Sequence, residues 1–152
     1  MRQVHRRFAI TGLLATAVSA CAPPPPAAPI PPTTVALTIT GDMDMNGRRP
    51  AKVKIYYLAS PARFGLADFF ALFDQAEATL GADLLGSDEF SLGPGRVVTD
   101  AKEFATPPAA IGIVAGFREV GGPGWRAITP LTPNAPNPVQ VTLSGNTVIV
   151  GK

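Results

Sequence analysis

The stretch KVKIYYL at residues 52–58 decides the fold class of this chain. Val53, Ile55 and Tyr57 share one side of an extended strand, while the two lysines and Tyr56 share the other, because successive side chains point to opposite faces. A period of two with one apolar side is typical of a strand that lies on a hydrophobic core. We therefore predict a half-buried β-strand here and expect others of the same kind on either side.

Similar short strands are predicted along most of the remaining chain. Residues 35–40 and 139–144 alternate in the same way. Residues 111–118 are apolar or small on both faces, which favours a central strand buried on both sides. Short strands at turn-punctuated intervals predict an all-β fold, a two-sheet β-sandwich. Further strands are expected at residues 89–92 and 96–104, which flank the turn Gly93-Pro94-Gly95, around Trp125, and at residues 147–150.

One stretch, about residues 64–85, has helical spacing instead. Leu66, Phe69, Phe70 and Phe73 recur at i, i+3, i+4 and i+7, which predicts one continuous apolar stripe on a helix. Leu80 continues that stripe, Asp68 falls in the first turn and Gly81 is a candidate C-terminal cap. We expect this insertion to pack its stripe against a sheet.

The N-terminus has the composition of a secretory leader. Three arginines precede an apolar run at residues 8–20, about 13 residues, which is shorter than the ~20 that a membrane span needs. Small residues then lead into Cys21, the only cysteine of the chain, and the run Val18-Ser-Ala-Cys21 looks like a bacterial lipobox. We expect residues 1–20 to be a lipoprotein signal peptide and Cys21 to carry lipid.

A proline-rich segment follows the cysteine. Residues 22–32 read APPPPAAPIPP, which favours polyproline II and cannot join a sheet ladder. A semi-rigid spacer and a disordered tether are both compatible with this composition. We therefore divide the chain into residues 1–20 (signal), residues 21–34 (lipidated cysteine and linker) and residues 35–152 (β-sandwich domain).

Composition narrows the possible functions. Three of the 13 basic residues lie in the leader, which leaves ten against 11 acidic residues, so the mature charge does not suggest a nucleic-acid partner. The only histidine, His5, is in the leader too. The mature chain therefore has no histidine general base and no His/Cys zinc site, and we expect no enzyme activity, no metal and no cofactor.

The segment Gly41–Pro50 lies between the first two predicted strands and can be interpreted in three ways. Asp42 and Asp44 could belong to a calcium loop, although arginines follow where a closing glutamate is usual. The segment could also be a solvated turn. In the third interpretation Met43 and Met45 face water and form the apolar centre of a contact surface with a charged rim.

Two further hypotheses concern other residues. Asp83, Asp88 and Glu89 are close in sequence, and paired carboxylates in a cleft could serve a hydrolase. A sandwich with an apolar pocket between its sheets, near Phe117 and Trp125, would suit a carrier of small ligands. A hydrolase and a carrier of small ligands are therefore alternatives to the hypothesis that the protein works through a contact surface.

The order and spacing of these pieces resemble the TssJ family, also called SciN or VasD, the outer-membrane lipoproteins of the bacterial type VI secretion system. The resemblance covers residues 35–150 and the lipobox. The segments that carry it are NGRRP at 46–50, VKIYYL at 53–58, the insertion at 64–85, LGPG at 92–95, GIVAGFR at 112–118, Trp125-Arg126 and the closing pair of strands.

The resemblance implies a transthyretin-like β-sandwich with a helical insertion and no catalysis. It implies a location on the periplasmic face of the outer membrane. Ala22 agrees with this location, because an alanine rather than an aspartate after the cysteine resembles lipoproteins that are sorted to the outer membrane. The implied partner is the periplasmic C-terminal region of TssM, with TssL in the same complex. The implied contacts lie in Gly41–Pro50, and we expect Met45→Asp or Arg48→Glu to weaken binding without unfolding. The expected contact residues are Met43, Asp44, Met45, Asn46, Arg48 and Arg49.

Overall fold

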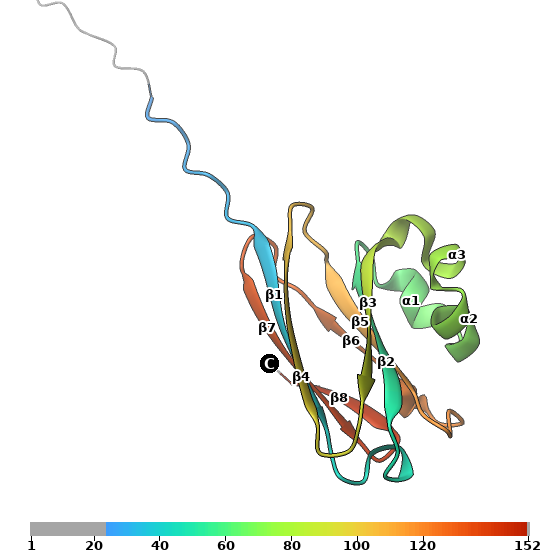
Figure 1. Cartoon of the computed structure of the whole chain (residues 1–152). Coiled ribbons are helices and arrows are strands. Elements are labelled where there is room, and N and C mark those ends of the chain that lie inside the picture. Colours follow the sequence, from blue (N-terminus) through green and yellow to red (C-terminus); the bar gives the residue numbers. More distant parts are fainter. Residues whose placement is uncertain (1–23, 152) are drawn as a thin grey trace, which may run out of the picture.

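Eight strands form two four-stranded sheets in the computed structural model, which describes residues 24–151 (Figure 1). The predicted two-sheet β-sandwich is confirmed. The first sheet has the order β4-β1-β7-β8 and the second has the order β3-β2-β5-β6. The strands are β1 (Thr33–Gly41), β2 (Ala51–Leu58), β3 (Leu84–Leu92), β4 (Val97–Phe104), β5 (Ala110–Gly116), β6 (Arg126–Pro130), β7 (Pro136–Ser144) and β8 (Thr147–Gly151).

Within residues 24–151 the strand pairings are antiparallel except one. β1 pairs antiparallel with β4 and parallel with β7, so it lies inside its sheet with a ladder along each edge. In the second sheet β2 and β5 are the inner strands, and every pairing is antiparallel. A parallel pair needs a long connection, which the chain between β1 and β7 supplies.

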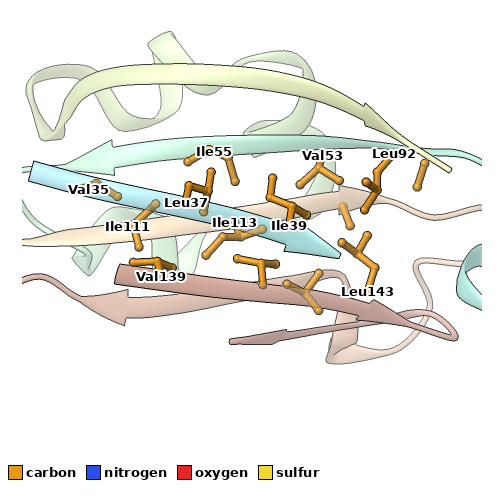
Figure 2. Packing of buried hydrophobic residues seen from close by; sticks show 14 of the residues in the cluster. Val35, Leu37, Ile39, Val53, Ile55, Leu92, Ile111, Ile113, Val139 and Leu143 are labelled. Carbon is orange, nitrogen blue, oxygen red and sulfur yellow. The ribbon is translucent and has the colours of Figure 1, made fainter. Parts of the chain in front are cut away.

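The core lies between the two sheets, as the alternating patterns predict. Val53 and Ile55 of β2 point toward Leu37 and Ile39 of β1, and none of these side chains is more than 2% exposed. Figure 2 shows these side chains interdigitating between the layers. The remaining labelled members of the cluster are Val35, Leu92, Ile111, Ile113, Val139 and Leu143.

β5 is buried on both faces, as predicted for residues 111–118. Its inner face belongs to the core, and its outer face is covered by the helical insertion. Gly112 shows how close this cover is, because a Cβ there would lie 2.6 Å from the ring of Phe64. Only glycine fits beneath this phenylalanine without a shift of the ring or the strand.

The insertion contains three short helices where the sequence predicted one stripe. They are α1 (Ala62–Leu66), α2 (Phe69–Asp74) and α3 (Ala76–Leu80). The break between α1 and α2 falls at Asp68, whose backbone is extended and whose Oδ1 accepts a hydrogen bond from Ala71 N–H at 2.9 Å. Asp68 is therefore an N-cap of a new helix. The helix axis changes there, so the predicted stripe is wrong.

The buried face of the insertion differs from that stripe accordingly. Leu66 is 91% exposed and Phe70 is 66% exposed. Leu80 is buried, as expected, and Gly81 ends α3 with φ of 54°. The side chains that pack on the outer face of the second sheet, against Tyr56, Leu58 and Val114, are Phe64, Leu72 and Leu80.

The two ends of the sandwich hold different segments. The described part of the linker enters at Thr33, and Gly41–Pro50 leaves β1 at the opposite end (Figure 1). Thr33 is fully buried and already paired in the sheet, so β1 starts two residues before the expected boundary at Val35. Residues 1–23, with the expected signal peptide and Cys21, lie outside the described residues. No helix in residues 24–151 is long and apolar enough to cross a membrane.

Candidate functional site

The segment Gly41–Pro50 is fastened to the neighbouring loops at its end of the sandwich. Gly41 exchanges backbone hydrogen bonds with the β3–β4 turn, donating to Arg96 and accepting from Gly95, both at 2.8 Å. Asp42 N–H donates to Leu143 at the end of β7, at 2.9 Å. These bonds join the start of the loop to the β3–β4 turn and to the end of β7.

A left-handed run gives the loop its turn. Asn46, Gly47 and Arg48 have φ of 48°, 61° and 62°, and a 3₁₀ turn spans Met45–Gly47. Two of these residues are not glycine, so the conformation needs compensating contacts. Asn46 supplies them: its Oδ1 accepts from Arg118 N–H and its Nδ2 donates to the Pro50 carbonyl, each at 2.8 Å.

Met45 lies inside the molecule. It is fully buried among the core residues, and a Cβ on Gly41 would clash with its Sδ. The expectation that both methionines face water is therefore wrong for Met45. The 3₁₀ turn directs it into the end of the core, while Met43 is 71% exposed.

The outward face of the loop carries the other expected contact residues. Met43, Asp44, Arg48 and Arg49 are exposed. A surface hollow of about 410 Å³ lies among the first three of these and Pro94. The hollow combines an apolar methionine and proline with charges of both signs, which is the composition of a protein contact. Asn46 is only 4% exposed, so it and Met45 support this face from below.

Pro94 is a residue of this surface that the sequence did not assign to it. The turn Gly93-Pro94-Gly95 was predicted only as a connection between strands. The hydrogen bonds from Gly41 bring it beside Met43, and a Cβ on Gly95 would lie 2.8 Å from the Met43 Sδ. No local signal in the sequence joins these two segments.

The acidic residues considered for hydrolysis are each held in an ion pair. Asp83 lies 3.4 Å from Arg63, and Glu89 lies 2.8 Å from Lys52. Asp88 accepts a hydrogen bond from Lys102, on β4 of the other sheet, at 2.6 Å. The hydrogen bond from Lys52 lowers the pKa of Glu89, whereas a general acid needs a raised pKa. Two of these ion pairs join strands, and the third, between Arg63 and Asp83, lies within the helical insertion.

The residues proposed to line a ligand pocket are packed instead. Phe117 is 5% exposed and belongs to the core cluster. Trp125 is half-buried between the core and the insertion, with Arg126 over its ring at 4.9 Å. The main cavities of the described chain lie at its surface, and neither Phe117 nor Trp125 lines them. Among residues 24–151 no three His, Cys, Asp or Glu side chains gather to hold a metal ion.

A family model matches most of this domain. It is described as type VI secretion lipoprotein, VasD, EvfM, TssJ, and it matches residues 33–146. No curated protein matches the chain in sequence. The matched range begins at the first residue of β1 and ends in the turn before β8.

Three solved structures are similar to the whole sandwich. The type VI secretion lipoprotein TssJ1 of Pseudomonas aeruginosa is 29% identical, with a TM-score of 0.76, over 80% of this chain and 96% of that one. Lip of Serratia marcescens, a membrane-bound component of the type VI secretion system, is 26% identical with a TM-score of 0.73, over 82% and 100%. A chain in a structure described as the TssM C-terminal domain (869–1107) from EAEC is 27% identical with a TM-score of 0.65, over 77% and 99%.

Proposed function

Because the chain belongs to the TssJ family of type VI secretion lipoproteins, we propose that it ties the membrane complex of that system to the outer membrane by binding the periplasmic C-terminal region of TssM. One observation carries the proposal. The linker joins the sandwich at Thr33, and the candidate contact loop begins at Gly41, the other end of the same strand (Figure 1). A membrane anchor and a protein partner can therefore be held at once, without competing for surface.

The membrane end of this link would be lipid on Cys21. A single acyl chain binds a membrane only marginally, and stable anchoring takes two signals. A processed bacterial lipoprotein supplies more than one chain on its cysteine. The proline-rich residues 22–32, if extended, would add a reach of roughly 30 Å at ~3.1 Å per residue.

The partner end would be the outward face of Gly41–Pro50. The chain matched in the TssM structure is about half as long as the range 869–1107, since 77% of these 152 residues covers 99% of it. That chain is therefore shorter than the whole TssM domain, as a TssJ-like chain in the same structure would be. We assign direct contacts to Met43, Asp44, Arg48 and Arg49, and a supporting role to Met45 and Asn46.

We propose a structural role without catalysis. The carboxylates considered for hydrolysis form ion pairs, and no described cavity fits the carrier hypothesis. Lipid on Cys21 and sorting to the periplasmic face of the outer membrane complete the proposal.

The test is a binding measurement between the full-length protein in detergent micelles and the periplasmic region of TssM. Arg48→Glu reverses a charge on the outward face and should weaken binding at least about tenfold, as expected for a like-charge contact. Arg63→Glu, a matched reversal on the exposed insertion, should leave affinity unchanged. Failure of the unmodified protein to bind at micromolar concentration would refute the partner, and equal affinity of both variants would move the interface elsewhere.

A further inference from the structure

A groove of about 690 Å³ lies between the helical insertion and β3, and the proposed TssM contact does not use it. It follows β3 from Leu84 to Glu89, whereas the loop Gly41–Pro50 adjoins the far end of that strand at Leu92. Its lining residues come from two strands and two helices: Lys54 and Tyr56 of β2, Leu84, Ser87, Asp88 and Glu89 of β3, and residues 73–78 of α2, α3 and the junction between them.

One side of the groove is an open sheet edge. β3 pairs with β2 along one edge, and no strand within residues 24–151 pairs with its other edge. Alternate backbone N–H and C=O groups of such an edge point outward and can pair with another strand. The groove thus offers main-chain partners to an extended segment about as long as the nine residues Leu84–Leu92.

The groove is acidic. Four carboxylates line it, those of Asp74, Glu77, Asp88 and Glu89, against the single ammonium group of Lys54. Asp88 and Glu89 are in ion pairs, while Asp74 and Glu77 are exposed and form no ion pair with any residue of the described chain. Two negative charges therefore remain free to meet a cation.

Tyr56 lines the groove between the carboxylates of its two sides. Burial raises its pKa to about 12, and the charges of Glu89 and Asp74 add to that rise. These two carboxylates belong to opposite sides of the groove, one on β3 and one on α2. A positive side chain between them would be attracted from both sides.

The charges also decide which strand could occupy the edge. A second copy of this chain pairing through its own β3 would bring Asp88 and Glu89 close to their counterparts, and like charges in adjacent strands are destabilising. An acidic segment would meet the same repulsion. We propose that the groove binds an extended lysine- or arginine-rich segment of a partner protein, which adds to the free edge of β3 as a fifth strand.

The geometry fits such a segment in two ways. Main-chain hydrogen bonds to β3 supply affinity without regard to sequence, and alternate side chains supply selectivity. Successive side chains on one face of a strand lie about 7 Å apart, so basic residues at alternate positions reach the groove one after another. The other face of the added strand stays outside the groove and carries no charge requirement.

The experiment uses fluorescence anisotropy with the full-length protein in non-ionic detergent micelles. The probe is a labelled peptide of about eight residues, a typical strand length, that alternates lysine with threonine. The double variant Asp74→Asn, Glu77→Gln should weaken its binding about three- to tenfold, as expected for two exposed ion pairs. The matched control Glu103→Gln, Glu119→Gln removes the same charge from exposed positions outside the groove and should bind as the unmodified protein does.

A second probe separates strand addition from simple charge attraction. The same peptide with alternate backbone amides methylated keeps its charge but loses the donors for β3, and should bind at least about tenfold more weakly. Hydrogen exchange should slow in residues 84–91 of β3 when the unmodified peptide is added, and should not slow in β4. Equal binding of the two peptides, equal effects of the two double variants, or protection of β4 alone would each overturn the proposal.

Discussion

Replacement of Met45 by alanine should destabilise the domain although this residue lies in a loop. Its side chain is fully buried at the end of the core, against Gly41 and the β3–β4 turn. Truncating a buried methionine costs about 2–5 kcal/mol, the transfer free energy plus a cavity. The cavity here is at the end of the core, where the turn can partly close it, so we expect about 2–3 kcal/mol.

The measurement is urea unfolding of the full-length protein followed by circular dichroism. With a slope of about 1–3 kcal/mol per molar for a small domain, the Met45→Ala midpoint should fall by about 1–2 M at an unchanged slope. Met43→Ala in the same loop is the control. Its side chain is mostly exposed, so its free energy of unfolding should change by less than about 0.5 kcal/mol.

Equal midpoints for the two methionine variants would refute the buried position of Met45. The same reasoning revises the expectation for Met45→Asp. A carboxylate forced into this site would lose its hydration without a cation in reach, so the variant should unfold before its effect on TssM binding can be measured.

Four further predictions follow from other contacts. Asn46→Ala removes both side-chain hydrogen bonds that hold the left-handed run, and should lower the free energy of unfolding by about 2–3 kcal/mol in the same urea assay. Gly112→Ala places a Cβ against Phe64 and should lower the free energy of unfolding by about 1–3 kcal/mol. Adding Phe64→Leu in a double variant should restore most of this stability, and a double variant without recovery would contradict the clash. The pKa of Glu89 is lower in the folded state than its value near 4.5 in the unfolded state. Its ion pair therefore stabilises the fold above about pH 4.5, and this contribution is lost as the pH falls. The difference in free energy of unfolding between the unmodified protein and Glu89→Gln should shrink from about pH 7 to about pH 3. Cys21→Ser should move the protein from the membrane to the soluble fraction of cells, and unchanged membrane association would contradict lipidation of Cys21.

The strands could be predicted because their signal is local. Val53, Ile55 and their equivalents alternate at the period of a strand, and one buried face is enough to fix that pattern. The helical insertion was also predicted correctly, but its single apolar stripe was not, because that stripe requires an unbroken helix axis. Asp68 is as compatible with the first turn of a longer helix as with an N-cap, and the sheet beneath decides which aromatic residues are buried.

The position of the loop could be predicted from the sequence, but the burial of Met45 could not. The segment Gly41–Pro50 can be located from its turn residues and its two flanking strands. The inward direction of Met45 follows from a left-handed run at residues 46–48, and the hydrogen bond from Arg118 that supports this run comes from a residue 72 positions later. A local sequence pattern cannot predict a contact between residues that are so far apart in the chain.

The position of β1 inside its sheet sets how the domain would respond to tension. A pull between the linker and the contact loop runs from Thr33 to Gly41, along the axis of one strand. Eight residues of β1 pair with β4 along one edge and eight with β7 along the other. Such a load shears both ladders in parallel, so their hydrogen bonds must rupture together and cannot unzip one at a time. In the proposed arrangement, a strand held along both edges thus lies on the line of force between the lipid anchor and the protein partner.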